Sequence, residues 1–441
     1  MNLERFEPFS YHSADEVKRD LEACGLPFSE DMAPLWEKKK LAGRCVPNRI
    51  LFQPMEGCDG ERDGRPGEAT WRRYRRFAQG GAGVIWGEAC AVVPEGRANP
   101  RQLMLTEENL PDYQRMVEMM REEARKTWGG EPVILLQLTH SGRFSRPEPG
   151  PLKPLLGTHS KPLDDAWHVS YDQPLVTDEY LDSLIPAFAR SARLAERAGF
   201  DGVDVKACHR YLASCLLSGF DRPGRYGGDY EGRTRLIRES FAAAASAVSP
   251  GFIMASRLNY YDGIELPGWG CSPDDFHQVM LDEPLRLTRD LLKEGLCLVN
   301  VTMGSPYYNP YVNRPANRGA AHPEHPLAGV RRLVSGAKAA NSEVSAVATG
   351  LSWLRQYGPN LAAALVRDGW ADFAGFGRMN FAYPDFPRDL KETGSIDGEK
   401  CCVGCGLCTA MMRAGGSTGC PVRDKDYYLP QYRALCQKKE G

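Results

Sequence analysis

Eight short apolar runs recur along the chain, and mostly helical, charged segments separate them. The runs are continuously apolar rather than alternating, which is typical of parallel strands buried on both faces. Amphipathic stretches such as 178–199 and 351–369 lie between them. Eight strand-then-helix units predict an α/β fold, a (β/α)₈ or TIM barrel. The runs span residues 49–55, 82–89, 133–140, 202–208, 251–259, 296–304, 343–350 and 371–378.

The alternative fold is a doubly wound sheet, which would need two separate halves. No G-x-G-x-x-G follows any of the eight runs, which disfavours this alternative. Three segments fall outside the barrel pattern. The lead-in, residues 1–44, carries a helix expected to be capped at Ser13–Glu16. Residues 305–330 form a long loop typical of a lid or binding loop. The expected division is a lead-in at 1–44, a barrel at 45–394 and a thiol-bearing segment at 395–441.

Charge and hydropathy narrow the classes of protein. The 441 residues include 55 Lys and Arg against 57 Asp and Glu, so no basic excess points to nucleic acid or an anionic membrane. Mean hydropathy is −0.43, and no apolar stretch approaches the length of a membrane span. The first residues lack the apolar core of a signal peptide. We therefore expect a cytoplasmic protein whose thiols stay reduced.

A cluster of thiols marks the end of the chain. Cys402, Cys405 and Cys408 are each separated by two residues, and Cys420 follows after eleven more. A tight loop and one more distant thiolate suit the four corners of a [4Fe–4S] cubane. Zinc is the competing interpretation, although it usually takes two C-x₂-C pairs or mixed histidine ligands. Cys401 could replace Cys402, but the spacing favours Cys402.

In a TIM barrel, function lies at the carboxyl ends of the strands. His209 and Tyr211 end the fourth run and are two residues apart, so they can face the same way. An imidazole beside a phenol suits polarising a carbonyl oxygen and delivering a proton to carbon. Gly350 and the "GFGR" that ends in Arg378 close the last two runs, where exposed backbone N–H groups and a guanidinium suit a phosphate. The alternative for these glycines is tight turns beside a surface arginine.

Several motifs together resemble the old yellow enzyme family of FMN-dependent oxidoreductases across most of residues 45–390. "VPNRILFQPMEG" is similar to the first-strand pattern of that family, and "LLQLTHSGR" is similar to its Q-L-x-H-x-G-R. "YLASCLLSGFDRPGRYGGDYEGRTR" resembles the stretch after the catalytic strand, and "ADFAGFGRMNFAYPDFP" resembles the phosphate-binding end. Each motif is weak alone, but their shared order makes the resemblance strong.

The resemblance implies roles for individual residues. His209 would bind the carbonyl oxygen of the substrate, and Tyr211 would protonate the adjacent carbon after hydride passes from flavin N5 to the far carbon. The remaining implied positions hold FMN along the backbone, at the pyrimidine edge and at the phosphate. Pro54 and Met55 would lie along the flavin with their backbone, Gln137 and Arg257 would bind its pyrimidine edge, and Gly350, Gly377 and Arg378 would hold the phosphate.

Two positions depart from the family pattern. Lys206 stands where the family usually has the first histidine of His-x-x-His or His-x-x-Asn. A lysine could donate to an oxyanion or pair with a substrate carboxylate, or it could turn aside and leave His209 to act alone. Glu56 occupies a position near the flavin where many relatives carry a small polar residue.

The cysteine spacing resembles the iron–sulfur branch of the same family, which includes trimethylamine dehydrogenase and the bacterial 2,4-dienoyl-CoA reductases. Because little sequence follows Cys420, we expect the further nucleotide-binding domains of those relatives to be missing. The electron donor is then external: a ferredoxin, a flavodoxin, a separate reductase, or NAD(P)H over the flavin. The sequence leaves a homo-oligomer open.

Three functions compete. The first is an ene-reductase that reduces a C=C bond conjugated to a carbonyl, supported by His209 and Tyr211. The second is an amine dehydrogenase or demethylase that sends electrons out through the cluster. It would need an aromatic cage for a cation, for which the candidates are Tyr307, Tyr308, Trp86 and Trp269. The third is an electron carrier, in which a proton-donating strand end would have no use.

Overall fold

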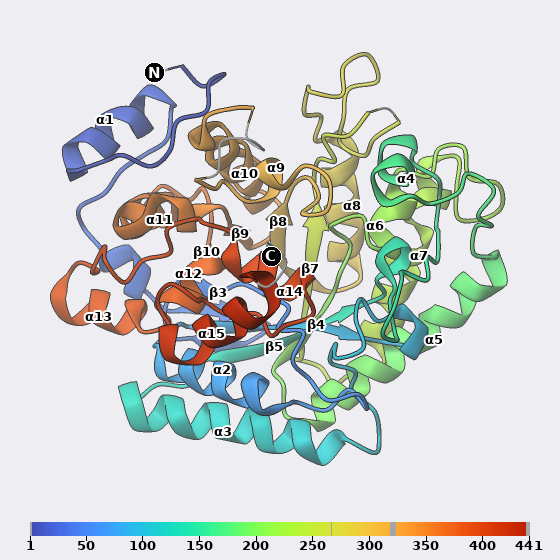
Figure 1. Cartoon of the computed structure of the whole chain (residues 1–441), viewed down its shortest axis with the longest axis horizontal. Helices are drawn as coiled ribbons and strands as arrows, with labels where there is room; N and C mark the ends of the chain where they lie inside the picture. Colours follow the sequence, from blue (N-terminus) through green and yellow to red (C-terminus); the bar gives the residue numbers. More distant parts are fainter. Residues whose placement is uncertain (1, 266, 318–322, 438–441) are drawn as a thin grey trace.

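A closed barrel of eight parallel strands forms the centre of the molecule (Figure 1). The computed structural model describes residues 2–265, 267–317 and 323–437. Each strand overlaps one predicted run, and β10 closes the ring by pairing with β3, so the predicted TIM barrel is confirmed. The strands are β3 (Ile50–Phe52), β4 (Val84–Ala91), β5 (Val133–Thr139), β6 (Gly202–Val205), β7 (Ile253–Asn259), β8 (Leu296–Thr302), β9 (Ala346–Ala348) and β10 (Phe373–Phe376).

The strands are buried on both faces, as the continuous apolar runs predict. On β4, Val84 and Trp86 point into the barrel interior, and Ile85 between them packs in the layer against the helices. Leu135 of β5 and Val347 of β9 join the interior cluster. The alternation follows from the two-residue repeat of a strand, so each strand supplies both hydrophobic layers.

Helices surround the barrel, and some of them, including α5 and α7, begin at side chains that cap their free N–H groups. Thr177 Oγ1 accepts from the Tyr180 N–H at the start of α5, and Asp229 does the same for Gly232 at the start of α7. The covering helices are α2 (Glu68–Gln79), α3 (Leu110–Trp128), α5 (Asp178–Arg197), α7 (Tyr230–Ser246), α8 (Asp282–Lys293), α10 (Pro326–Asn341), α11 (Gly358–Arg367) and α13 (Phe386–Thr393). Shorter helices are α4 (Lys161–Trp167), α6 (Leu212–Leu217), α9 (Pro310–Asn313) and α12 (Arg378–Ala382).

The lead-in packs first against the segments that follow β8 and β9, where the Phe9 N–H donates to Asn317 Oδ1 and the Phe9 ring contacts Trp353, and its hairpin then reaches the far end of the barrel. Its helix α1 (Ala14–Ala23) starts after Ser13, whose side chain accepts from the Glu16 N–H, as the sequence predicts. An antiparallel hairpin, β1 (Lys39–Leu41) and β2 (Arg44–Val46), follows. Leu41 and Val46 belong to the interior cluster, so the hairpin closes the barrel core.

The C-terminal segment contains α14 (Leu407–Arg413) and α15 (Lys425–Tyr432), which lie in front of β3 and β10 in the view of Figure 1. It is bound to α2 by charge. Asp424 accepts hydrogen bonds from Arg72 at 2.6 Å and from Arg76 at 2.5 Å. The Arg72 guanidinium also lies 4.4 Å from the centre of the Tyr427 ring. These contacts hold the thiol-bearing segment against the barrel.

The expectation of a continuous loop over 305–330 is only partly right. Helix α9 interrupts this segment and α10 begins at Pro326, because Pro310 and Pro326 each occupy a first helical turn, where proline is tolerated. Residues 318–322 of this stretch lie outside the described residues. No helix in the described part of the chain is long and apolar enough to cross a membrane.

Candidate active site

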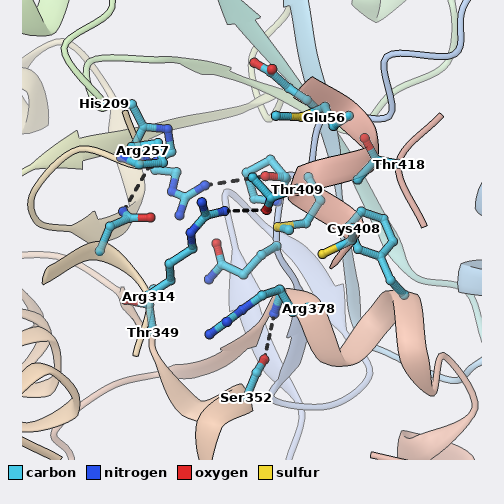
Figure 2. Close-up of a pocket in the computed structure, with 18 of the residues that line it drawn as sticks. Glu56, His209, Arg257, Arg314, Thr349, Ser352, Arg378, Cys408, Thr409 and Thr418 are labelled. Carbon is cyan, nitrogen blue, oxygen red and sulfur yellow. Dashed lines mark hydrogen bonds between the residues drawn. The ribbon is translucent and has the colours of Figure 1, made fainter. Parts of the chain in front are cut away.

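A large cavity opens at the carboxyl ends of the strands and encloses about 1060 Å³ of atom-free space, including its mouth (Figure 2). Its walls come from segments that are far apart in the sequence, including the end of β3, the turn after β6 and helix α14. Every catalytic and flavin-binding residue predicted from the sequence lines it. They are Pro54, Met55, Gln137, Lys206, His209, Tyr211, Arg257, Gly350, Gly377 and Arg378.

The turn after β6 presents His209 and Tyr211. His209 and Arg210 both have left-handed backbone, with φ of 65° and 59°, which costs free energy for residues other than glycine. The buried Arg210 guanidinium offsets this cost by pairing with Asp262 at 2.6 Å. The sharp turn lets the strand end at Val205 and places Tyr211 immediately before α6.

Tyr211 is buried, and its hydroxyl is held by two partners. It donates a hydrogen bond to Glu56 Oε1 at 2.9 Å and lies 2.8 Å from the hydroxyl of Tyr307. Burial raises the pKa of Tyr211 well above its usual value, and the charge of Glu56 raises it further. The phenol therefore stays protonated at physiological pH and is available as a proton donor.

The pKa of His209 is shifted in the opposite direction, downward. Burial lowers its pKa well below the usual value, and the positive charges of Arg257, Lys206 and Arg314 lower it further. The imidazole is therefore neutral. Its Nε2 lies 3.3 Å from Asn313 Nδ2, an amide that also donates to Thr302 Oγ1 at 2.7 Å. These contacts fix the ring at the cavity wall.

Lys206 faces the cavity rather than turning aside. Its Nζ lies 3.6 Å from Glu56 Oε1 and 3.9 Å from the centre of the Tyr211 ring. The side chain is almost fully buried, and the Glu56 carboxylate is its compensating charge. Of the two placements that the sequence left open, the structure shows the one in which lysine joins the imidazole and the phenol.

The floor of the cavity carries unpaired hydrogen-bonding groups. Gln137 Nε2 donates one of its two N–H groups to Asp204 Oδ2 at 2.5 Å, so the amide still offers one N–H and its oxygen. Gln53 Oε1 accepts from Asn300, whereas the buried Gln53 Nε2 and Arg257 Nε have no partner among the described residues. A buried donor without a partner is costly. This mixture of acceptor and free donors fits the alternating C=O and N–H edge of a flavin ring.

The opposite end of the cavity is rich in positive charge. Arg314 and Arg378 both line it, and neither pairs with a carboxylate of the described residues. Burial, with the nearby charge of Arg378, lowers the pKa of Arg314 to about 10. Gly350 has φ of 88°, a conformation in which a side chain is strained, and its backbone borders the same space. The buried guanidinium of Arg378 and the half-buried guanidinium of Arg314, beside exposed backbone, fit a phosphate dianion.

The four predicted cluster cysteines line a small cavity of their own: Cys402, Cys405, Cys408 and Cys420. Gly404 and Gly406, with φ of 66° and 75°, bend the loop between them. Cys401 is fully buried, and its thiol donates to the Asp397 carbonyl at 3.3 Å instead of facing this cavity. Among the described residues, no three His, Cys, Asp or Glu side chains converge on the position of a single metal ion. Cys408 lines both this cavity and the large one.

Comparison with known protein families shows which family the chain belongs to. Residues 40–307 match the model of the NADH:flavin oxidoreductase / NADH oxidase family. The chain belongs to this family. It is therefore an oxidoreductase of the old yellow enzyme type.

Relatives in this family differ in length. A metal reductase of Desulforamulus reducens is 26% identical over 85% of this chain, which spans only 51% of that relative. An NADPH dehydrogenase of Bacillus pumilus is 25% identical over 82% of this chain and is covered over 95% of its length. The matched part of this chain thus spans about half the length of the first relative and nearly the full length of the second.

Solved structures in the family share the fold. A 2-naphthoyl-CoA reductase superposes with a TM-score of 0.72 at 19% identity, covering 91% of this chain and 58% of that one. An old yellow enzyme homologue from Zymomonas mobilis superposes with a TM-score of 0.60 at 19% identity, and the match covers 83% of this chain and 94% of the homologue. At these identities the likeness concerns the barrel itself.

Sequence reasoning missed several residues of this family site. Gln53 directly precedes the predicted Pro54, so its position at a strand end was the available signal. Residues from the 305–330 segment and α14 carry no periodic pattern that would assign them to the cavity. Of the candidates for an amine cage, Trp86 and Trp269 do not line the cavity, because they are buried and bonded to Asp204 and the Asn259 carbonyl, whereas Tyr307 lines it. Other lining residues that the sequence did not assign to the cavity include Asn313, Arg314, Ser352, Phe381, Thr409, Met412, Arg413 and Thr418.

Proposed function

We propose that this oxidoreductase is an FMN-dependent ene-reductase acting on a C=C bond conjugated to a carbonyl. The observation that carries the proposal is a protonated phenol and a neutral imidazole on one turn, facing a cavity whose floor carries unpaired donors. Bound FMN supplies hydride transfer to the substrate. Gln137 and Arg257 would hold the ring edge, Pro54 and Met55 would contact the ring, and Gly350, Gly377, Arg314 and Arg378 would hold the phosphate.

The chain's own residues supply the polar part of the reaction. His209 binds the substrate carbonyl oxygen, and Lys206 adds positive charge where negative charge develops on that oxygen. Tyr211 transfers its phenolic proton to the carbon next to the carbonyl. Tyr307 and Glu56 are hydrogen-bonded to the phenol, so they form the route by which Tyr211 is protonated again.

We further propose that residues 395–441 hold a [4Fe–4S] cluster on Cys402, Cys405, Cys408 and Cys420. Four thiols line one cavity, three of them within seven residues of sequence, and this arrangement suits a cubane better than zinc, which usually takes two C-x₂-C pairs or mixed histidine ligands. Electrons then arrive from a ferredoxin, a flavodoxin, a separate reductase or NAD(P)H, and Cys408 borders both cofactors. A cubane of reduced thiolates also favours the cytoplasm.

The decisive test of the ene-reductase is Tyr211→Phe. In anaerobic stopped-flow experiments, reoxidation of the reduced protein by cyclohexenone should slow by about 10²-fold or more, because protonation loses its donor. Flavin reduction should be unchanged. Tyr308→Phe is the matched control, since Tyr308 is partly exposed and outside the cavity.

The opposite pattern contradicts the proposal. If di- or trimethylamine reduces the flavin while enones fail to reoxidise it, the enzyme is an amine dehydrogenase. If Tyr211→Phe reoxidises as fast as the unmodified protein, Tyr211 is not the proton donor.

A further inference from the structure

A second cavity adjoins the catalytic one and is not accounted for by FMN or the cluster. It encloses about 730 Å³ of atom-free space, including its mouth. Four residues line both cavities and form the wall between them: Glu56, Tyr307, Met412 and Arg413. Because Tyr307 touches the Tyr211 hydroxyl, a molecule reacting at Tyr211 can extend into this second space.

One side of the second cavity is a fixed aromatic wall. Phe144 stacks on Tyr307 with ring centres 3.9 Å apart and planes 15° from parallel. The Trp167 ring packs edge-on against Phe144 at 5.3 Å, and its Nε1 donates to the Tyr307 carbonyl at 3.2 Å. Rings held in this way present a flat apolar surface of constant shape. Such a surface favours a flat, unsaturated body over a flexible chain.

The same cavity carries two positive charges without a carboxylate partner. The half-buried Arg146 and the exposed Arg413 both line it, and neither forms an ion pair within the described part of the chain. The buried Arg146 Nε lacks any hydrogen-bond partner there, and Arg413 donates only to the Pro306 carbonyl, at 3.0 Å. Glu56 also lines the cavity, but its charge is taken up by Lys206 and Tyr211.

We propose that this cavity binds the far end of the substrate and selects a flat aromatic or polyunsaturated body that carries a carboxylate. The aromatic wall stacks on the body, and the forked guanidinium of Arg146, with Arg413 beside it, binds the carboxylate. This inference rests on the proposed ene-reductase, because the conjugated C=C bond must lie at Tyr211 while the carboxylate lies at Arg146.

The test compares two probes that differ in one charge: 4-(4-carboxyphenyl)but-3-en-2-one and its methyl ester. Saturation of the anaerobic reoxidation rate gives an apparent dissociation constant for each probe. The unmodified protein should prefer the carboxylate, and Arg146→Gln should lower that preference about tenfold, the effect of losing a charge-assisted hydrogen bond. Arg146→Lys should retain part of it, and Arg19→Gln, at an exposed arginine, should change nothing.

Failure of this inference differs from failure of the proposed function. If both probes reoxidise the protein and Arg146→Gln leaves their ratio unchanged, the subsite is wrong and the ene-reductase stands. If neither probe reoxidises it, calorimetric binding of the carboxylate probe to the oxidised protein still decides the subsite, which is overturned when Arg146→Gln binds equally well. A variant that loses only NADPH-dependent reduction would assign the cavity to the nicotinamide donor and contradict the proposal.

Discussion

Glu56 contacts both Tyr211 and Lys206 at the border between two cavities. Its carboxylate accepts from Tyr211, lies 3.6 Å from Lys206 Nζ and borders both large cavities. A small polar residue there could not neutralise Lys206, whereas the Glu56 carboxylate does so. The pair places a charged donor in the site without leaving it uncompensated.

The contact between Glu56 and Tyr211 predicts how the rate of reoxidation depends on pH. Because burial and Glu56 raise the pKa of Tyr211, the phenol should remain protonated beyond its ordinary value of about 10. The rate of reoxidation by cyclohexenone should therefore show no fall attributable to Tyr211 up to about pH 9. Glu56→Gln removes one cause of the rise, so the alkaline fall should move to lower pH. A shift to higher pH in stopped-flow profiles would contradict this assignment.

Two adjacent cysteines allow a second test at the scale of residues. Cys402 faces the cavity of four thiols, whereas Cys401 donates to Asp397 and is directed elsewhere. Cys402→Ser should lower iron and labile sulfide per protein severalfold, with FMN retained, because one cubane corner loses its thiolate. Cys401→Ser is the matched control and should keep its iron. Iron loss from Cys401→Ser alone would reverse the ligand assignment.

Among the elements, α15 is anchored at its start by the Asp424 carboxylate. Asp424 binds Arg72 and Arg76 of α2 and is largely shielded from solvent, so its ion pairs are screened less than surface pairs. This contact explains how a short helix with little buried surface stays beside the cluster cavity.

Removing the anchor should loosen α15 locally. Asp424→Asn should speed amide hydrogen exchange in 425–432 about tenfold, because losing one charge-assisted interaction lowers the local opening free energy by about 1.4 kcal/mol. Asp426→Asn, an exposed change in the same helix, should have no such effect. Equal exchange in the two variants would show that other contacts hold α15.

The elements also show what could be predicted from the sequence. All eight strands follow from apolar runs, because burial on both faces leaves a pattern within each run. The left-handed turn at His209 and Arg210 leaves no such pattern, so the predicted fourth run extends beyond the strand end at Val205. The contact between Tyr211 and Glu56 joins residues 155 positions apart and appears only in the folded chain.

For the whole molecule, the central claim is that one chain couples a flavin site to a cluster site. Cys408, Arg378 and Phe381 line both cavities, so the two cofactors would be separated by single side chains. The flavin exchanges electrons in pairs or singly, and the cluster exchanges them singly. This difference makes the number of electrons taken up a direct measure of both cofactors.

An anaerobic titration of the purified protein with dithionite, followed by absorbance, tests this claim most directly. The account predicts uptake of about three electron equivalents per chain, two by FMN and one by the cluster, and return of the flavin pair to an added enone. Uptake of only two equivalents would show a flavin without a cluster, and no uptake would show neither. Either result would contradict the account.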